Sequence, residues 1–392
     1  MKTLQLNYQF TNSSNAPLTL WLALPSADAH HPQLTLKLNR EADATHASAD
    51  NLIACFELAA QQKLEFDCEF ASPNYPLQEN LGPEMREFYL RSSSLVNLDD
   101  ALRRYADNQV AVAADAKTQA RQLFTHLLDT YQYQSACTER SAQAMLRQKR
   151  GDSMAFALLY AALCRARQIP CRVVFGALCT GTMSPHCWNE IYLENQGWLP
   201  VDCGMAKLAK SVWRSLTLGI TVLPWQAYFG ALEGPRMVFS LDCDLPCPPG
   251  YHEHPEAQGP VSRLGGHEIH WGLELLDGKL PYLQPAYVQL DSSYARPASS
   301  LSEKLHRARL STQLLGSWRA NFRGNWRYPL QKTWSFALYL YAGEILVSWF
   351  NPQTWLTALR SSTTAVVLGL SGALLLWQIV ASYWARRQFK PD

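Results

Sequence analysis

A serine, a histidine and an aspartate follow one another in an order that could carry nucleophilic chemistry. Ser153 directly precedes an unbroken apolar run of 11 residues, 154–164, and His186 and Asp202 lie in two later apolar segments. The run predicts a buried helix, which would place Ser153 at a helix N-terminus, where unpaired N–H groups stabilise an anion. A histidine on a nearby strand can take the nucleophile's proton, and an aspartate can fix the imidazole tautomer. The predicted catalytic residues are therefore Ser153, His186 and Asp202, as nucleophile, base and orienting carboxylate.

Apolar periodicity predicts the helices and strands around these residues. A helical face recurs over residues 116–131, and a shorter helix is predicted over 138–147. Strands are predicted over 171–178, 186–192 and 197–202, and a further strand over 236–242.

The N-terminal residues 1–105 show a different period. Leu4, Leu6, Tyr8 and Phe10 alternate with polar residues, and the same alternation recurs over 18–24, 34–38 and 64–70. Period two puts one apolar face inward, so these residues predict a small antiparallel β-sandwich. Its residue types suggest a structural or docking module.

Four separated motifs resemble the transglutaminase-like superfamily, in its bacterial form, whose members share the papain-like cysteine-enzyme core. The family's Gly-x-Cys, Gly-Ile-Pro-Ala-Arg, His-x-Trp-x-Glu and Gly-Trp-x-x-x-Asp correspond here to Gly151-Asp-Ser153, Gln168-Ile-Pro-Cys-Arg172, His186-Cys-Trp-Asn-Glu190 and Gly197-Trp-Leu-Pro-Val-Asp202. The resemblance implies an α+β fold over residues 106–290, with a nucleophile helix packed on an antiparallel sheet. It also implies acyl transfer or amide hydrolysis.

Ser153 departs from the family, because it stands where the family has its cysteine. A hydroxyl is far harder to ionise than a thiol, whose pKa is about 8.5 and falls further in such sites. We therefore expect Ser153 to cap the helix, as Asp152 also could, and the domain to be a pseudoenzyme that binds a peptide or protein. The alternative is an enzyme that uses Ser153, His186 and Asp202, and a third interpretation takes Ser153 as a replacement for a natural cysteine.

A rival site of another class is a zinc-binding module. Its candidate ligands are cysteines and histidines, the residue types that bind zinc, although their spacing departs from the usual zinc motifs. They are Cys243, Cys247, His252, His254, His267 and His270. The prediction is that the chain holds no metal and no cofactor.

The amino-acid composition further limits the class of protein. Hydrophobic residues at 47% and charged residues at 17% argue against global disorder, and ten cysteines in 392 residues are too sparse for a disulfide scaffold. The first residues lack the apolar core of a signal peptide, which favours a reducing compartment.

The C-terminal quarter predicts a membrane attachment. Residues 291–332 form a linker, in which 301–332 contains seven Lys or Arg and one acid; this favours anionic lipid over nucleic acid. Residues 361–385 carry no charge, so 364–384 predicts a transmembrane helix. Residues 333–350, with Glu344 inside, predict a second membrane or interfacial helix. We expect a two-helix hairpin in the bacterial inner membrane with the main domain in the cytoplasm. A single span and a periplasmic domain are the alternatives.

Overall fold

The computed structural model describes residues 3–12, 17–71, 73–111, 114–134, 141–179, 183–211, 223–232 and 236–246, short strands between 263 and 321, and helical residues 327–350, 362–373 and 376. The chain divides into two compact units. The first comprises Met1–Gly204 with Phe229–Phe322, and the second comprises Met205–Tyr228 with Arg323–Asp392.

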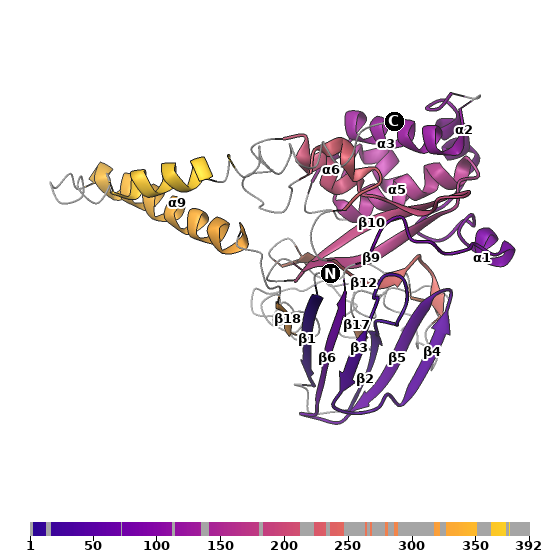
Figure 1. The fold of residues 1–392 in the computed structure, drawn as a ribbon, viewed down its shortest axis with the longest axis horizontal. Coiled ribbons are helices and arrows are strands. Elements are labelled where there is room, and N and C mark those ends of the chain that lie inside the picture. Colours follow the sequence, from indigo (N-terminus) through magenta and orange to yellow (C-terminus); the bar gives the residue numbers. More distant parts are fainter. Residues whose placement is uncertain are drawn as a thin grey trace. The chain divides into compact units, whose positions relative to one another are not determined.

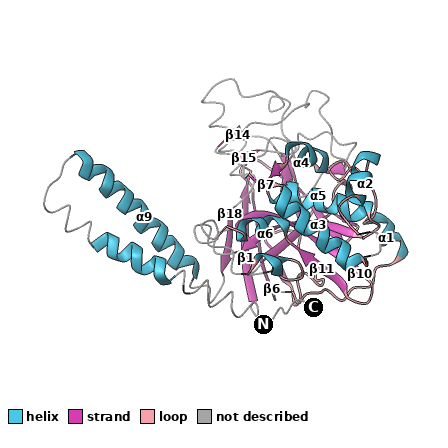
Figure 2. Cartoon of the chain, turned by 90° about the horizontal axis from the view of Figure 1, so that it is seen from above, coloured by secondary structure: helices cyan, strands magenta, loops and turns pink. Residues whose placement is uncertain are grey.

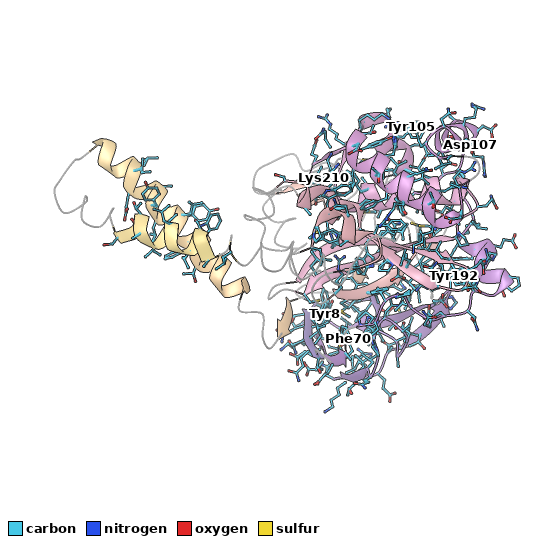
Figure 3. The ribbon with its side chains drawn as sticks, turned by 45° about the horizontal axis from the view of Figure 1, so that its top comes forward. Tyr8, Phe70, Tyr105, Asp107, Tyr192 and Lys210 are labelled. Carbon is cyan, nitrogen blue, oxygen red and sulfur yellow. The ribbon has the colours of Figure 1, made fainter. Side chains whose placement is uncertain are left out.

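The N-terminal strands form a sandwich of two four-stranded sheets (Figure 1). One sheet has the order β18-β1-β6-β3, from Ser317–Asn321, Thr3–Thr11, Lys63–Ala71 and Thr35–Leu38. The other has the order β17-β2-β5-β4, from Ala286–Val288, Leu18–Ala23, Asn51–Leu58 and Ala44–Ser48. Tyr8 and Phe70 lie in the core of this sandwich and are fully buried, which confirms the inward face that the alternation predicts (Figure 3).

The sandwich also takes strands from late in the chain. In antiparallel register, β18 pairs with β1, Trp318 opposite Tyr8, and β17 pairs with β2, Tyr287 opposite Trp21. The sequence places residues 286–288 in the transglutaminase-like domain and 317–321 in a linker. The structure differs because edge strands β1 and β2 have backbone groups that a returning strand can pair.

A second layer holds the predicted site residues. Its antiparallel sheet has the order β11-β10-β9-β12, from Gly197–Val201, Met183–Leu193, Cys171–Cys179 and Arg236–Leu241. The helices α5, α3 and α2 lie on one side of this sheet and the sandwich lies on the other (Figure 1). Their bounds are Ser153–Ala166, Ala116–Thr130 and Asp100–Asp107. The fold class predicted for this part, a helix packed on an antiparallel sheet, is confirmed.

The other elements of the described residues are short. They are α1 (Pro83–Phe88), β7 (Gln132–Tyr133), α4 (Ala142–Gln148), β8 (Arg150–Gly151), α6 (Cys203–Ala209), η1 (Trp225–Tyr228), β13 (Leu245–Pro246), β14 (Arg263–Leu264), β15 (His267–Glu268) and β16 (Lys279–Leu280). The predicted helix over 138–147 begins at Ala142, and residues 135–140 lie outside the described residues.

Helix α5 is the core of the second layer. Every residue from Met154 to Arg165 is buried, as the apolar run predicts. The helix ends where Gln168 adopts a left-handed φ of 59° and the Ile169 N–H donates to the Cys164 carbonyl oxygen at 3.0 Å. Pro170 then follows, and β9 begins at Cys171.

The C-terminal residues form two helices, α9 (Arg327–Phe350) and a helix over 362–373, which lie side by side (Figures 1 and 2). Among the described residues, no helix is both long and apolar enough to cross a membrane. The predicted span over 364–384 is described only at 364–373 and Leu376, and its remainder lies outside the described residues. The described residues therefore do not support the predicted transmembrane helix.

Candidate functional site

His186 and Asp202 meet at the end of two neighbouring strands. The register of β10 with β11 sets Asn189 opposite Val201, which places Asp202, the next residue, level with Trp188 and two positions along β10 from His186. His186 Nε2 lies 2.7 Å from Asp202 Oδ2, and both side chains are buried. A carboxylate only accepts hydrogen bonds, so Nε2 carries the proton and Nδ1 is the nitrogen that could take one from a nucleophile.

Arg236, the first residue of β12, shares the same carboxylate oxygen. Its Nη1 donates to Asp202 Oδ2 at 2.8 Å, and its Cζ lies 4.9 Å from the centre of the Trp188 ring. Trp188 in turn stacks on His186, with ring centres 6.2 Å apart and planes 19° apart. Arg236 was not among the predicted site residues, although it begins the strand that the sequence predicts over 236–242. The imidazole is thus held by a carboxylate, and the carboxylate by a guanidinium.

Gly176 makes room for this stack. It lies opposite His186 in the register of β9 and β10. A Cβ there would stand 2.7 Å from Trp188 Cη2 and 2.1 Å from the Met237 carbonyl oxygen. No side chain can occupy that space without moving β12 or the indole that supports His186.

Ser153 is the first residue of α5, and Asp152 is its N-cap. The Asp152 side chain accepts a hydrogen bond from the Ala155 N–H at 3.0 Å. The expectation that Ser153 caps the helix is therefore wrong, because Asp152 fills the capping position. Ser153 is half-buried and stands at the positive end of the helix dipole.

Gly204 places Ser153 beside the aspartate. A Cβ built on Gly204 would lie 3.1 Å from Ser153 Cβ and 3.5 Å from Asp202 Oδ1. The start of α5 and the end of β11 are therefore close neighbours, and a glycine separates them. Asn189 joins α5 to β10, because its Nδ2 donates to the Ala157 carbonyl oxygen at 2.9 Å. The structure thus brings the three predicted residues into one region, and their catalytic roles stay predictions.

No described thiol offers a substitute nucleophile. The eight described cysteines are all buried. Burial raises the pKa of the Cys203 thiol well above its ordinary value, and the neighbouring Asp202 charge raises it further. Burial likewise raises the pKa of the Cys171 thiol. A thiol held neutral in this way is the reverse of the reactive thiolate that cysteine enzymes use.

The motif residues Glu190 and Arg172 form a separate buried cluster. Arg172 Nε donates to Glu190 Oε2 at 2.7 Å, and the Tyr75 hydroxyl donates to Glu190 Oε1 at 2.7 Å. His30 Nε2, from the sandwich, lies 3.0 Å from Glu190 Oε2. Burial opposes ionisation of Glu190, but the charges of His30 and Arg172 outweigh it and lower its pKa to about 2. This cluster joins the sandwich to the second layer, and no pattern in the sequence pointed to His30.

The predicted zinc ligands cannot be assembled from the described residues. Cys243 is fully buried, and burial raises the pKa of its thiol well above the ordinary value. Cys247, His252, His254 and His270 lie outside the described residues. The part of the chain that the structure describes contains no group of three His, Cys, Asp or Glu that could hold a metal.

Two cavities of about 440 Å³ each open elsewhere in the first unit. One is lined by residues of β1, β3 and β6, including Asn7, Lys37 and Asp67, and the other by residues around α1, including Arg86 and Gln168. Neither is lined by Ser153, His186 or Asp202. The candidate site therefore rests on its side-chain geometry.

Comparison with known proteins finds a family whose profile matches part of the chain. Residues 103–203 match the sequence profile of the Transglutaminase-like superfamily. No curated protein matches the chain.

Three solved structures are similar to part of the chain. A candidate cysteine protease from Cytophaga hutchinsonii is 16% identical, with a TM-score of 0.41 over 52% of this chain and 76% of that one. A candidate protease from Parabacteroides distasonis is 10% identical, with a TM-score of 0.24 over 51% of this chain and 46% of that one. A TGase is 12% identical, with a TM-score of 0.18 over 36% of this chain and 41% of that one. Likenesses at this level carry no argument about activity or substrate.

Proposed function

We propose that this chain uses a transglutaminase-like site to bind a peptide or protein, with weak or no catalysis, because residues 103–203 match the profile of the transglutaminase-like superfamily. One observation carries the proposal. The base and its orienting carboxylate are in place, since His186 Nε2 lies 2.7 Å from Asp202 Oδ2, but the helix N-terminus beside them presents Ser153. A hydroxyl in a site framed for a thiolate lacks the ionised nucleophile.

A single substitution distinguishes a site that lacks only its nucleophile from a site whose other catalytic residues are also misplaced. We expect the full-length Ser153→Cys variant to react with iodoacetamide at residue 153 and the parent chain to leave residue 153 unlabelled by a fluorophosphonate serine probe. Adding His186→Ala to Ser153→Cys should slow labelling by about tenfold or more, because the imidazole no longer accepts the thiol proton. Peptide mass mapping reads both reactions, and labelling of Ser153 itself in a His186-dependent manner would overturn the proposal.

Binding needs a separate measurement. A defined pool of glutamine-containing peptides is incubated with the full chain, and the retained peptides are identified by mass. The Ser153→Phe variant should retain none, because a ring at the start of α5 fills the space next to Asp202. Equal retention by both proteins would contradict binding at this site, and circular dichroism of the variant checks its fold.

The second candidate is an acyl-transfer or amide-hydrolysing enzyme with Ser153 as nucleophile. It is favoured by the cap at Asp152, which leaves the half-buried Ser153 hydroxyl without a capping role. In that reaction His186 Nδ1 would take the proton from Ser153 Oγ as the oxygen attacks the amide carbon, and Asp202 would stabilise the imidazolium. The serine-probe experiment decides between the two candidates.

We also propose that the C-terminal segments tether the chain to a bilayer, with the transglutaminase-like domain on the cytoplasmic side. The support comes from the basic character of 301–332 and from Arg386, Arg387 and Lys390 at the tail. Protease accessibility in spheroplasts tests the side, because an external protease should leave the main domain intact.

A further inference from the structure

In the paired C-terminal helices, large apolar side chains face outward and polar side chains face the partner helix. This is the reverse of the pattern in a water-soluble helical hairpin. We call α9 and the helix over 362–373 the C-terminal hairpin. Every large apolar residue that is exposed in the described part of the chain lies between residues 336 and 376. Phe336 is 65% exposed and Leu346 63% exposed on α9, and Leu368 is 66% exposed on the second helix. In the first unit, the large apolar residues that the structure describes are not exposed in this way.

Polar groups lie in the seam between the two helices. Trp334 Nε1 donates to Ser371 Oγ at 2.7 Å, and the Thr363 hydroxyl donates to Glu344 Oε2 at 2.5 Å. Ser371 Oγ donates in turn to the Val367 carbonyl oxygen at 2.7 Å. The carboxylate within the apolar part of α9 thus has a donor on the partner helix. Helices that pack in water bury an apolar stripe and expose polar residues, whereas helices in lipid expose apolar residues and bond polar groups to each other.

The residues that precede the hairpin in the sequence indicate which apolar partner its exposed side chains contact. Residues 301–332 contain seven basic residues, Lys304, Arg307, Arg309, Arg319, Arg323, Arg327 and Lys332, and one acid, Glu303. Basic residues beside a membrane-facing segment are attracted to anionic lipid headgroups. A protein partner would account for an apolar surface, but it would not by itself account for this charge beside it.

We propose that the C-terminal hairpin binds an anionic lipid surface as one unit, with Phe336, Leu346 and Leu368 in contact with lipid and the Glu344–Thr363 and Trp334–Ser371 bonds inside the pair. The inference deepens the proposed tether by naming the element and its partner. It requires no spanning helix and does not depend on Ser153. The lipid-binding test and the labelling at residue 153 can therefore fail separately.

Flotation of the full chain with vesicles tests the proposal. We expect the protein to float with vesicles of phosphatidylcholine containing anionic phosphatidylglycerol and to float much less with phosphatidylcholine alone. Leu346→Glu with Leu368→Glu should lower the bound fraction on anionic vesicles by about tenfold or more, because two charges would enter lipid. The matched control is Thr35→Glu with Thr11→Glu, which adds the same charge at exposed positions of the sandwich and should float like the parent.

Three results would overturn the proposal. The first is a parent chain that stays unbound on anionic vesicles, and the second is a hairpin double variant that binds like the parent. The third is an oligomer, seen by light scattering without vesicles, that the double variant dissociates while neither protein floats. That result would assign the apolar surface to a second copy of the chain.

Discussion

Replacing Asp202 with asparagine removes one charge while keeping the shape of the side chain. Asp202 is fully buried, and its Oδ2 receives both His186 Nε2 at 2.7 Å and Arg236 Nη1 at 2.8 Å. In Asp202→Asn the guanidinium of Arg236, only 6% exposed, would keep its charge without the carboxylate. The expected result is a large decrease in the free energy of unfolding, because the unpaired charge lies in the second layer.

The size of the loss follows from the buried charge that is left without its partner. Removing one partner of a buried ion pair costs about 3–5 kcal/mol, because the other charge stays buried. The contact of Arg236 with the Trp188 ring is present in both proteins, so it does not change the difference between them. We therefore expect the free energy of unfolding to fall by about 3–5 kcal/mol.

Urea unfolding followed by tryptophan fluorescence measures this change. Adding Arg236→Gln to Asp202→Asn should recover at least about 1 kcal/mol, since the unpaired charge is then gone. The matched control is Asp115→Asn, an exposed cap of α3 whose carboxylate accepts from the Thr118 N–H at 2.7 Å, because asparagine caps equally well. The reasoning would be refuted if Asp202→Asn cost no more than this control, or if the two site substitutions were additive.

Two further predictions concern the surroundings of the site. Gln168→Gly should stabilise the fold by about 0.5–1 kcal/mol and raise the melting temperature by a few degrees, because glycine adopts the left-handed φ of 59° without strain; Gln168→Ala should give no gain. Glu190 has a pKa lowered from 4.5 to about 2, so its contribution is fully present above pH 4.5 and is lost as pH falls toward 2. Glu190→Gln should therefore make the free energy of unfolding less dependent on pH between pH 5 and 2, whereas exposed Glu57→Gln should not. Chemical denaturation at stepped pH values measures both variants. If Glu190→Gln leaves the pH dependence of the unfolding free energy unchanged, the lowered pKa of Glu190 is contradicted.

Local patterns in the sequence predicted much of the fold. The alternation at Leu4, Leu6, Tyr8 and Phe10 became β1, and the apolar run after Ser153 became the buried helix α5. These predictions work because side-chain periodicity depends on residues a few positions apart. The strands β4 and β5 were missed, since 51–58 is buried at most positions and shows no clean alternation.

Contacts between residues far apart in the chain could not be predicted from the sequence. β17 and β18 return to the N-terminal sheets, His30 reaches Glu190 across 160 positions, and Arg236 reaches Asp202 across 34. No local period encodes such contacts, because they depend on how strands and loops pack in three dimensions.

The order of Ser153, His186 and Asp202, and the missing thiol, could be read from the sequence by itself, because side-chain chemistry is fixed by residue type. The packing of the folded chain decided that Asp152 rather than Ser153 caps α5 and that Arg236 shares the carboxylate of Asp202. It also decided that the hairpin turns its apolar residues outward. Each of these depends on which groups compete for the same partner or the same solvent once the chain has folded.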